Sequence, residues 1–96
     1  MEFEMPRKRI VCQDGFSMSV QASAGHYCEP RITGLGFYNS YEIGYITQEE
    51  ELLTPFAEDP ENLTATIYGW VPVSVVAEVI AKHGGVVGTE QGEVSL

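Results

Sequence analysis

Four residues of the chain have the side-chain types that most often bind zinc. They are Cys12, His26, Cys28 and His83. Zinc accepts two thiolates and two imidazoles in a tetrahedron, but structural sites usually contain close pairs such as Cys-x-x-Cys. Only His26 and Cys28 are close in this sequence. The spacing therefore favours free thiols and two separate histidines, with a zinc-stapled structural module as the alternative.

Cys28 together with His26 or His83 could also act as a thiolate and its base. Such a pair needs a third group that orients the base and a donor for an oxyanion, and no motif marks either of them. The glycines give no phosphate-binding loop, because Gly34-x-Gly36 lacks a third glycine and a following helix. We therefore expect a protein that is not an enzyme and that uses no cofactor.

Six carboxylates are concentrated in two short segments of the chain. They are Glu49, Glu50, Glu51, Glu58, Asp59 and Glu61. A solvated surface is the ordinary place for such residues. If they form one patch, they would instead bind a basic protein surface, because complementary charge steers association.

An aromatic group is the other candidate binding site. Tyr68 and Trp70 lie on the same side of a predicted strand. Tyr27 and Arg31 lie in a loop that could bring them next to these two rings. If this face is open, it is a stacking platform for a nucleotide or a protein hot spot. If a helix covers it, the rings belong to the core.

The elements that must position these residues begin with a β-hairpin. Asp14-Gly15 favours a two-residue turn between strands at residues 9–13 and 16–22. The second strand alternates apolar and polar residues, so we expect one buried face. A long loop of residues 25–40 follows, and loops of this length are often functional.

The second half of the chain predicts two strands and two helices. Residues 41–46 and 63–71 have strand patterns, and in the second of these the aliphatic side, opposite Tyr68 and Trp70, is expected to face the core. Thr47 and Glu50 resemble a capping box, which predicts a short helix that Pro55 ends. Residues 73–82 have the apolar spacing of a helix, with Gly84-Gly85 at its end.

These elements predict an α+β fold, in which a small antiparallel sheet is packed by the C-terminal helix and one short helix. A chain of 96 residues has room for one core. We expect a flexible leader at residues 1–8, a single domain at residues 9–87 and a flexible tail at residues 88–96. Val75 and Val79 widen the apolar arc of the C-terminal helix, which leaves a homodimer contact open.

The charge of the chain bears on its partners. Five Lys and Arg against fourteen Asp and Glu give a net charge of −9, which repels the phosphates of duplex DNA or RNA. The first six residues carry acids where a signal peptide needs cations, and no apolar run is long enough for a membrane span. We expect a cytoplasmic protein without a membrane partner.

Three segments give the chain a resemblance to small accessory proteins of tailed bacteriophages and prophages. The segments are residues 15–23, the run His26-Tyr27-Cys28-x-Pro30-Arg31 and residues 68–73. The resemblance covers residues 12–85 and leaves the leader outside it. The resemblance implies a class of proteins that inhibit host defence. They do so either by blocking the surface of a CRISPR effector or by sequestering a nucleotide signal. It brings no catalytic residues with it.

Together these observations lead to one main hypothesis and two alternatives. The main hypothesis is a phage accessory protein that binds and inhibits a host defence component through an acidic and aromatic surface. The residues expected to bind are Tyr27, Arg31, Tyr68, Trp70, Glu49, Glu50, Glu51, Glu58, Asp59 and Glu61. The alternatives are a sponge for a cyclic nucleotide and the zinc-stapled module.

Overall fold

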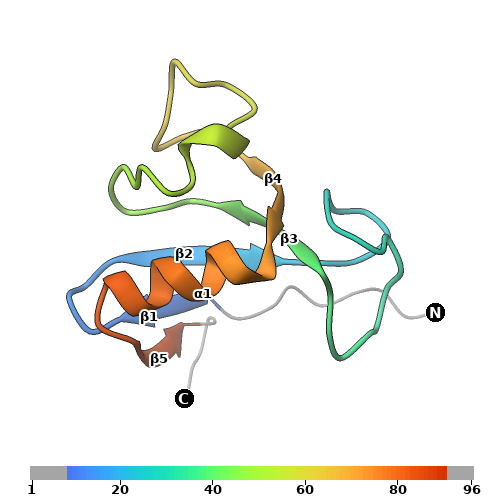
Figure 1. Cartoon of the computed structure of the whole chain (residues 1–96), viewed down its shortest axis with the longest axis horizontal. Helices are drawn as coiled ribbons and strands as arrows, with labels where there is room; N and C mark the ends of the chain where they lie inside the picture. Colours follow the sequence, from blue (N-terminus) through green and yellow to red (C-terminus); the bar gives the residue numbers. More distant parts are fainter. Residues whose placement is uncertain (1–8, 91–96) are drawn as a thin grey trace.

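The computed structural model describes residues 9–90, which form a five-stranded sheet and one α-helix (Figure 1). In chain order the elements are β1 (Arg9–Cys12), β2 (Ser17–Gln21), β3 (Ser40–Gly44), the 3-10 helix η1 (Thr54–Phe56), β4 (Tyr68–Pro72), α1 (Val73–Lys82) and β5 (Val86–Glu90). The strand order is β4-β3-β2-β1-β5, and every neighbouring pair is antiparallel. The predicted α+β class is confirmed.

The hairpin of β1 and β2 turns at Asp14-Gly15, as predicted. Gly15 has a φ of +96°, which glycine adopts without steric cost. The Asp14 carboxylate accepts a hydrogen bond from the Phe16 N–H at 2.9 Å and so stabilises the turn locally. Met18 and Val20 of β2 are buried, while the half-buried polar residues Ser19 and Gln21 face the other side of the sheet.

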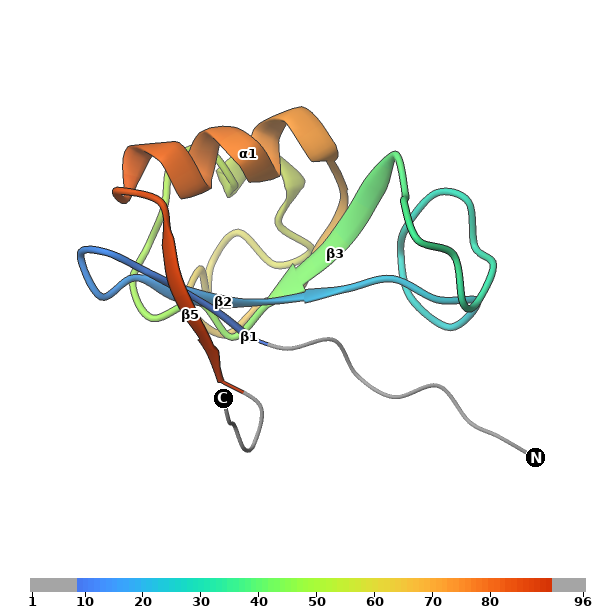
Figure 2. The ribbon, with the colours of Figure 1, turned by 90° about the horizontal axis from the view of Figure 1, so that it is seen from below.

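Helix α1 covers one face of the sheet (Figure 2). Its buried residues Val76 and Val79 share one core cluster with Met18 and Ile43 of the strands. Val75 is half-buried against the same core. The wide apolar arc of the helix therefore packs against the core of the chain, and the homodimer contact stays a prediction. Among residues 9–90 no helix covers the opposite face of the sheet, which we call the open face.

The C-terminal end of α1 is docked against the hairpin turn. Gly84 and Gly85 both have a φ of +92°, and the Gly85 N–H donates to the Ile80 carbonyl at 2.9 Å, as in a helix that ends at a glycine pair. A Cβ on Gly84 would lie 2.7 Å from the Cβ of Gln13. The close approach of the two segments therefore depends on glycine at this position.

Strand β4 begins at Tyr68, so the prediction of a strand from Leu63 is wrong for residues 63–67. Local hydrogen bonds turn this segment instead. The N–H groups of Ala65 and Thr66 both donate to the Asn62 carbonyl at 2.9 Å, and the Tyr68 hydroxyl donates to the Leu63 carbonyl. Backbone groups that a strand would pair are already satisfied within the turn.

A bulge in β4 changes which side chains face the core. The pairing of β3 with β4 shifts between Tyr41 and Ile43, and Trp70 has a φ of +50°. Because of this bulge Tyr68 and Val71 are both fully buried, while Trp70 turns outward. The prediction that Tyr68 and Trp70 share one face is therefore wrong.

The short helix predicted to begin at Thr47 is also absent from that position. The Thr47 hydroxyl accepts a hydrogen bond from the Ser17 N–H at 3.0 Å. It therefore binds the first residue of β2 and does not cap a helix. Glu50 is buried rather than placed in an exposed first turn. The chain runs through bends and turns until η1, where Pro55 stands in the first turn.

The C-terminal part of the described chain adds a strand that the sequence analysis missed. Strand β5 pairs with β1, with Thr89 opposite Ile10. The expected flexible tail of residues 88–96 is thus wrong for residues 88–90. The remaining residues 91–96 and the expected leader, residues 1–8, lie outside the described residues.

The predicted long loop connects β2 to β3 and has a small core of its own. Ala22, Cys28 and Tyr38 form a second buried cluster, and the rings of Tyr38 and Tyr41 form an edge-to-face pair with centroids 5.7 Å apart. This cluster fixes the position of the loop at one end of the sheet. Within residues 9–90 no helix has the length and apolar character needed to cross a membrane.

Candidate functional site

The four residues of zinc-binding type do not meet in the fold. Cys12 lies in the main core and Cys28 in the second cluster. Within residues 9–90 no group of three or more His, Cys, Asp or Glu side chains is placed to hold a metal ion. The set proposed for the zinc-stapled alternative is therefore not brought together.

The suggested thiol and imidazole pair is not formed either. The Cys28 thiol donates to the Ser23 carbonyl at 3.2 Å, and Nδ1 of His26 lies 2.6 Å from the Ser23 hydroxyl. Both groups thus bond to Ser23 rather than to each other. Their contacts hold the start of the loop in place.

The other histidine lies in a buried network of charged groups that the sequence analysis missed. Nδ1 of His83 is 2.6 Å from the Asp14 carboxylate, and Nε2 is 2.6 Å from the Glu50 carboxylate. The second oxygen of Glu50 accepts from Lys82 at 2.8 Å. The imidazole also stacks on the Phe16 ring, with centroids 4.2 Å apart. The network ties the hairpin turn, the segment before η1 and the end of α1 together.

The protonation of this network follows from its contacts. Burial alone would lower the pKa of His83, but its hydrogen bonds with Glu50 and Asp14 raise that pKa above its ordinary value. Burial would raise the pKa of Glu50, yet hydrogen bonds from Lys82, the Leu52 N–H and His83 lower it. Because both ring nitrogens already have partners, His83 has no free nitrogen for acid or base chemistry.

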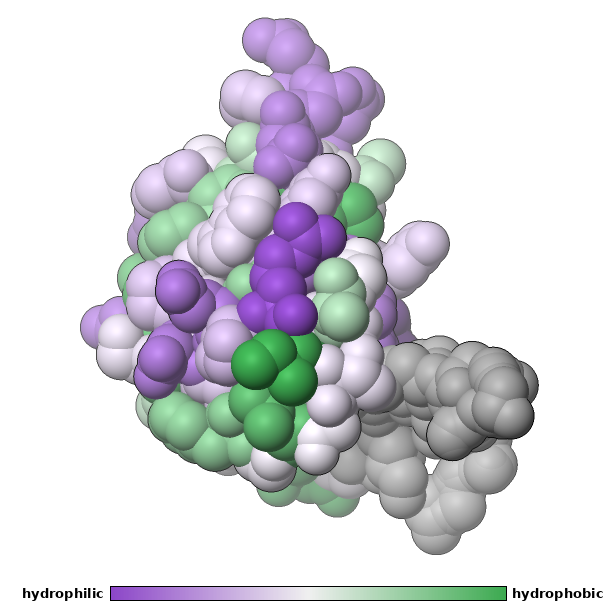
Figure 3. Space-filling model, turned by 90° about the vertical axis from the view of Figure 1, so that its right-hand side faces the viewer, coloured by the Kyte–Doolittle hydropathy of each residue, from purple (hydrophilic) through white to green (hydrophobic). Residues whose placement is uncertain are grey.

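The six predicted acidic residues do not act as one set. Glu50 is only 2% exposed and belongs to the buried network, so its expected place on a docking surface is wrong. Glu49 and Glu51 line a shallow hollow beside Lys82. Glu58, Asp59 and Glu61 are exposed in the segment between η1 and β4, where hydrophilic residues project at the top of Figure 3.

Three of the four predicted aromatic-site residues do meet. The rings of Tyr27 and Trp70 stack with centroids 4.8 Å apart and planes 15° from parallel. The guanidinium carbon of Arg31 lies 5.7 Å from the centroid of the Tyr27 ring. We call Tyr27, Arg31 and Trp70 the aromatic surface. Tyr68 is fully buried and does not belong to it.

Backbone contacts fix this surface to the sheet. The Trp70 N–H donates to the Tyr27 carbonyl at 2.9 Å, and the Tyr27 N–H donates to Oε1 of Glu42 at 2.9 Å. A Cβ on Gly69 would lie 3.3 Å from Cβ of Tyr27 and 3.6 Å from a carboxylate oxygen of Glu58. Glycine at this position lets the loop pack closely on β4. The carboxylates of Glu42 and Glu58 both lie close to this contact.

The end of the molecule that carries the loop is rich in exposed apolar side chains. Trp70 is 46% exposed, and in the loop Ile32 and Phe37 are 52% and 62% exposed. Figure 3 looks at this end and shows hydrophobic residues directly beside strongly hydrophilic ones. Isolated apolar side chains on a surface are normal, but a group of large ones at one end is typical of a binding site.

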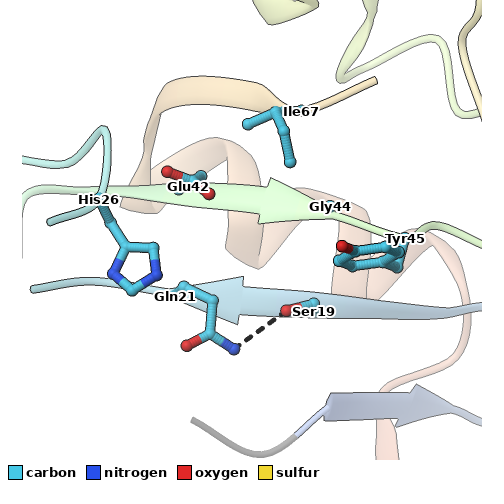
Figure 4. A pocket seen from close by; sticks show the side chains of 7 residues that line it. All are labelled: Ser19, Gln21, His26, Glu42, Gly44, Tyr45 and Ile67. Carbon is cyan, nitrogen blue, oxygen red and sulfur yellow. Dashed lines mark hydrogen bonds between the residues drawn. The ribbon is translucent and has the colours of Figure 1, made fainter. Parts of the chain in front are cut away.

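A pocket of about 390 Å³ opens near the aromatic surface (Figure 4). Its lining residues are Ser19, Gln21, His26, Glu42, Gly44, Tyr45 and Ile67. The polar residues of β2 and β3 that line it belong to the open face. Tyr45 is 72% exposed and has a φ of +51°. The alternation in β2 predicts a polar face, but no sequence signal indicates that it is hollowed.

Comparison of the chain with protein-family models, curated proteins and solved structures finds no match. The resemblance to phage accessory proteins therefore stays a prediction.

Proposed function

We propose that the chain is a non-enzymatic binding protein that recognises a protein partner through the aromatic surface. The observation that supports this proposal is the positive φ of Trp70, which is +50°. A bulky residue at positive φ costs about 1–3 kcal/mol and persists where the surroundings or the function require it. The residue with this strained backbone is 46% exposed. Trp70 belongs to neither of the two buried core clusters.

The composition of the surface supports a protein partner. Trp, Tyr and Arg are the residue types most enriched in binding hot spots. The stack of Tyr27 on Trp70 holds both rings in one orientation before binding, which reduces the entropy lost on association. Ile32 and Phe37 of the same loop add apolar area around it.

The charge distribution favours a partner with a basic surface. Glu42 and Glu58 lie next to Tyr27, and the whole chain has a net charge of −9. Complementary charge raises association rates and rejects acidic partners. A nucleotide would need cations for its phosphates, and among the described residues Arg31 is the cation that lies at this surface. The phage resemblance implies a host defence protein as the partner, and that identity is part of this proposal.

The proposal is tested by capture and then by measured affinity. Tagged wild-type chain is used to capture a partner from a bacterial lysate, and the captured protein is purified and titrated by calorimetry. Trp70→Ala is expected to weaken binding by about 2 kcal/mol or more, which is roughly 30-fold in Kd. The matched control is Val87→Ala, which truncates a side chain 56% exposed on β5.

Two results would overturn the proposal. One is a purified partner that binds Trp70→Ala and wild type with equal Kd. The other is quenching of the fluorescence of Trp70, the single tryptophan, by a cyclic di- or trinucleotide at micromolar concentration. The second result would assign the surface to a nucleotide signal, which is the sponge alternative.

A further inference from the structure

We infer that the pocket of the open face binds an arginine side chain of the partner. This inference rests on the proposed function and names the chemistry of one contact. The pocket is continuous with the aromatic surface, because His26 lines it and the Tyr27 N–H is bonded to Glu42, which also lines it. A partner that covers Tyr27 and Trp70 can therefore reach the pocket with one side chain.

Glu42 supplies the acceptor for a guanidinium. Its Oε1 is held by the Tyr27 N–H at 2.9 Å, which fixes the direction of the carboxylate. Within residues 9–90 its Oε2 has no hydrogen-bond partner, and the side chain lies at the pocket wall (Figure 4). A carboxylate that is oriented in advance and has a free oxygen is well suited to a charge-assisted hydrogen bond.

Tyr45 supplies a face for the cation. Tyr45 is 72% exposed, and its ring stands at one end of the pocket, while the His26 ring stands at the other end (Figure 4). The positive φ of Tyr45 costs energy in the way that it does at Trp70, and the Tyr45 carbonyl accepts a hydrogen bond from Arg9. A guanidinium over a tyrosine ring gains a cation–π attraction.

The charge and shape of the lining favour a cation over an anion. Among the described residues that line the pocket, Glu42 is the one carboxylate, and there is no Lys or Arg. The guanidinium of Arg9 lies beside the pocket, where it donates to the Tyr45 carbonyl and the Ser17 hydroxyl. Gly44 forms part of the wall, where a Cβ would lie 3.2 Å from Cδ1 of Ile67. The absence of a side chain at Gly44 keeps the pocket open next to Ile67, whose apolar surface suits the methylene stem of arginine.

The test uses short peptides and the full chain. The peptide acetyl-Gly-Arg-Gly-amide is titrated into ¹⁵N-labelled protein, and the amide shifts of Gly44 and Tyr45 are followed. The matched peptide contains citrulline, which has nearly the shape of arginine without its charge. We expect saturable shifts at these amides with arginine and at least about tenfold weaker binding with citrulline. Equal binding of the two peptides, or no shifts at the pocket, overturns the inference.

Variants assign the binding to Glu42. Glu42→Gln keeps an oxygen for the Tyr27 N–H and removes the charge, so the protein is expected to stay folded and to bind the arginine peptide about tenfold more weakly. Glu78→Gln removes the same charge from an exposed position on α1 and is expected to bind like wild type. If the two variants bind equally, general charge attraction explains the binding and the pocket does not.

This test is separate from that of the proposed function. Peptide binding that depends on Glu42, combined with partner binding that ignores Trp70→Ala, would refute the aromatic surface and leave the pocket. Partner binding that depends on Trp70, combined with equal binding of the arginine and citrulline peptides, would refute the pocket and leave the proposed function.

Discussion

The buried network around His83 predicts a large effect of one conservative substitution, Glu50→Gln. Glu50 is 2% exposed and accepts three hydrogen bonds, from His83 at 2.6 Å, Lys82 at 2.8 Å and the Leu52 N–H at 2.9 Å. Glutamine has nearly the same volume, so the substitution opens no cavity. It removes the negative charge between two cationic groups and places an amide N–H₂ against at least one donor.

The size of the effect follows from these contacts. Removing one partner of a buried ion pair costs about 3–5 kcal/mol, because the other charge is left without compensation. His83 can escape part of this cost by losing its proton and accepting from the glutamine amide. We therefore expect a loss of about 2–3 kcal/mol. In a domain of this size 1 kcal/mol corresponds to about 4–8 °C, so Tm should fall by roughly 10–20 °C.

Thermal unfolding followed by circular dichroism at pH 6 measures this loss. The control is Glu51→Gln, the same change at the next residue, whose side chain is 88% exposed and lies 4.0 Å from Lys82. Exposed pairs contribute little, so Tm of the control should move by less than about 3 °C. If both variants melt within about 3 °C of wild type, Glu50 does not hold the hairpin turn and the helix end together.

Four further predictions concern stability. The raised pKa of His83 means that its protonated form stabilises the fold. This stabilisation is fully present below the ordinary pKa of 6.5 and is lost as pH rises through the raised pKa. Urea midpoints should therefore fall above about pH 6.5, and His83→Gln should flatten that slope. The lowered pKa values of Asp14 and Glu50 predict a second loss on the acid side, below their ordinary values of 3.8 and 4.5. Gly84→Ala should destabilise the protein more than Gly85→Ala in urea unfolding. Both glycines have a φ of +92°, but of the two only Gly84 would bring a Cβ into contact with Gln13. Equal losses would mean that the hairpin turn does not pack against Gly84. Trp70→Gly should change the unfolding free energy by less than about 1 kcal/mol, since relief of strain offsets the lost stacking, whereas a marked loss would show that Trp70 is there for stability.

The parts of the fold that sequence reasoning predicted are those with local causes. The turn at Asp14-Gly15 is stabilised by a bond from Asp14 to a residue two positions away. Helix α1 has both its apolar spacing and its glycine end within one stretch of chain. Patterns of this kind are visible in a sequence because the interacting residues are neighbours in it.

The parts that were mispredicted depend on distant partners. Glu50 looks like a capping residue, but it is bound by His83, which is 33 residues away, and His83 in turn binds Asp14, at a separation of 69 residues. The bulge at Trp70 is set by pairing with β3, and it overrides the alternation that a plain strand would show. Local patterns contain no information about such pairings.

The candidate site shows the same division between local and distant causes. Tyr27, Arg31 and Trp70 were selected by residue type, and the fold brings them together, whereas Tyr68 was selected by a strand register that the bulge alters. The bulge is thus the single feature that separates an exposed Trp70 from a buried Tyr68. A regular strand would place Tyr68 and Trp70 on one face and Val71 on the other, without the conformational cost of a positive φ. The chain instead retains a positive φ at Trp70 and leaves that residue 46% exposed, and the proposed recognition of a partner would account for both features.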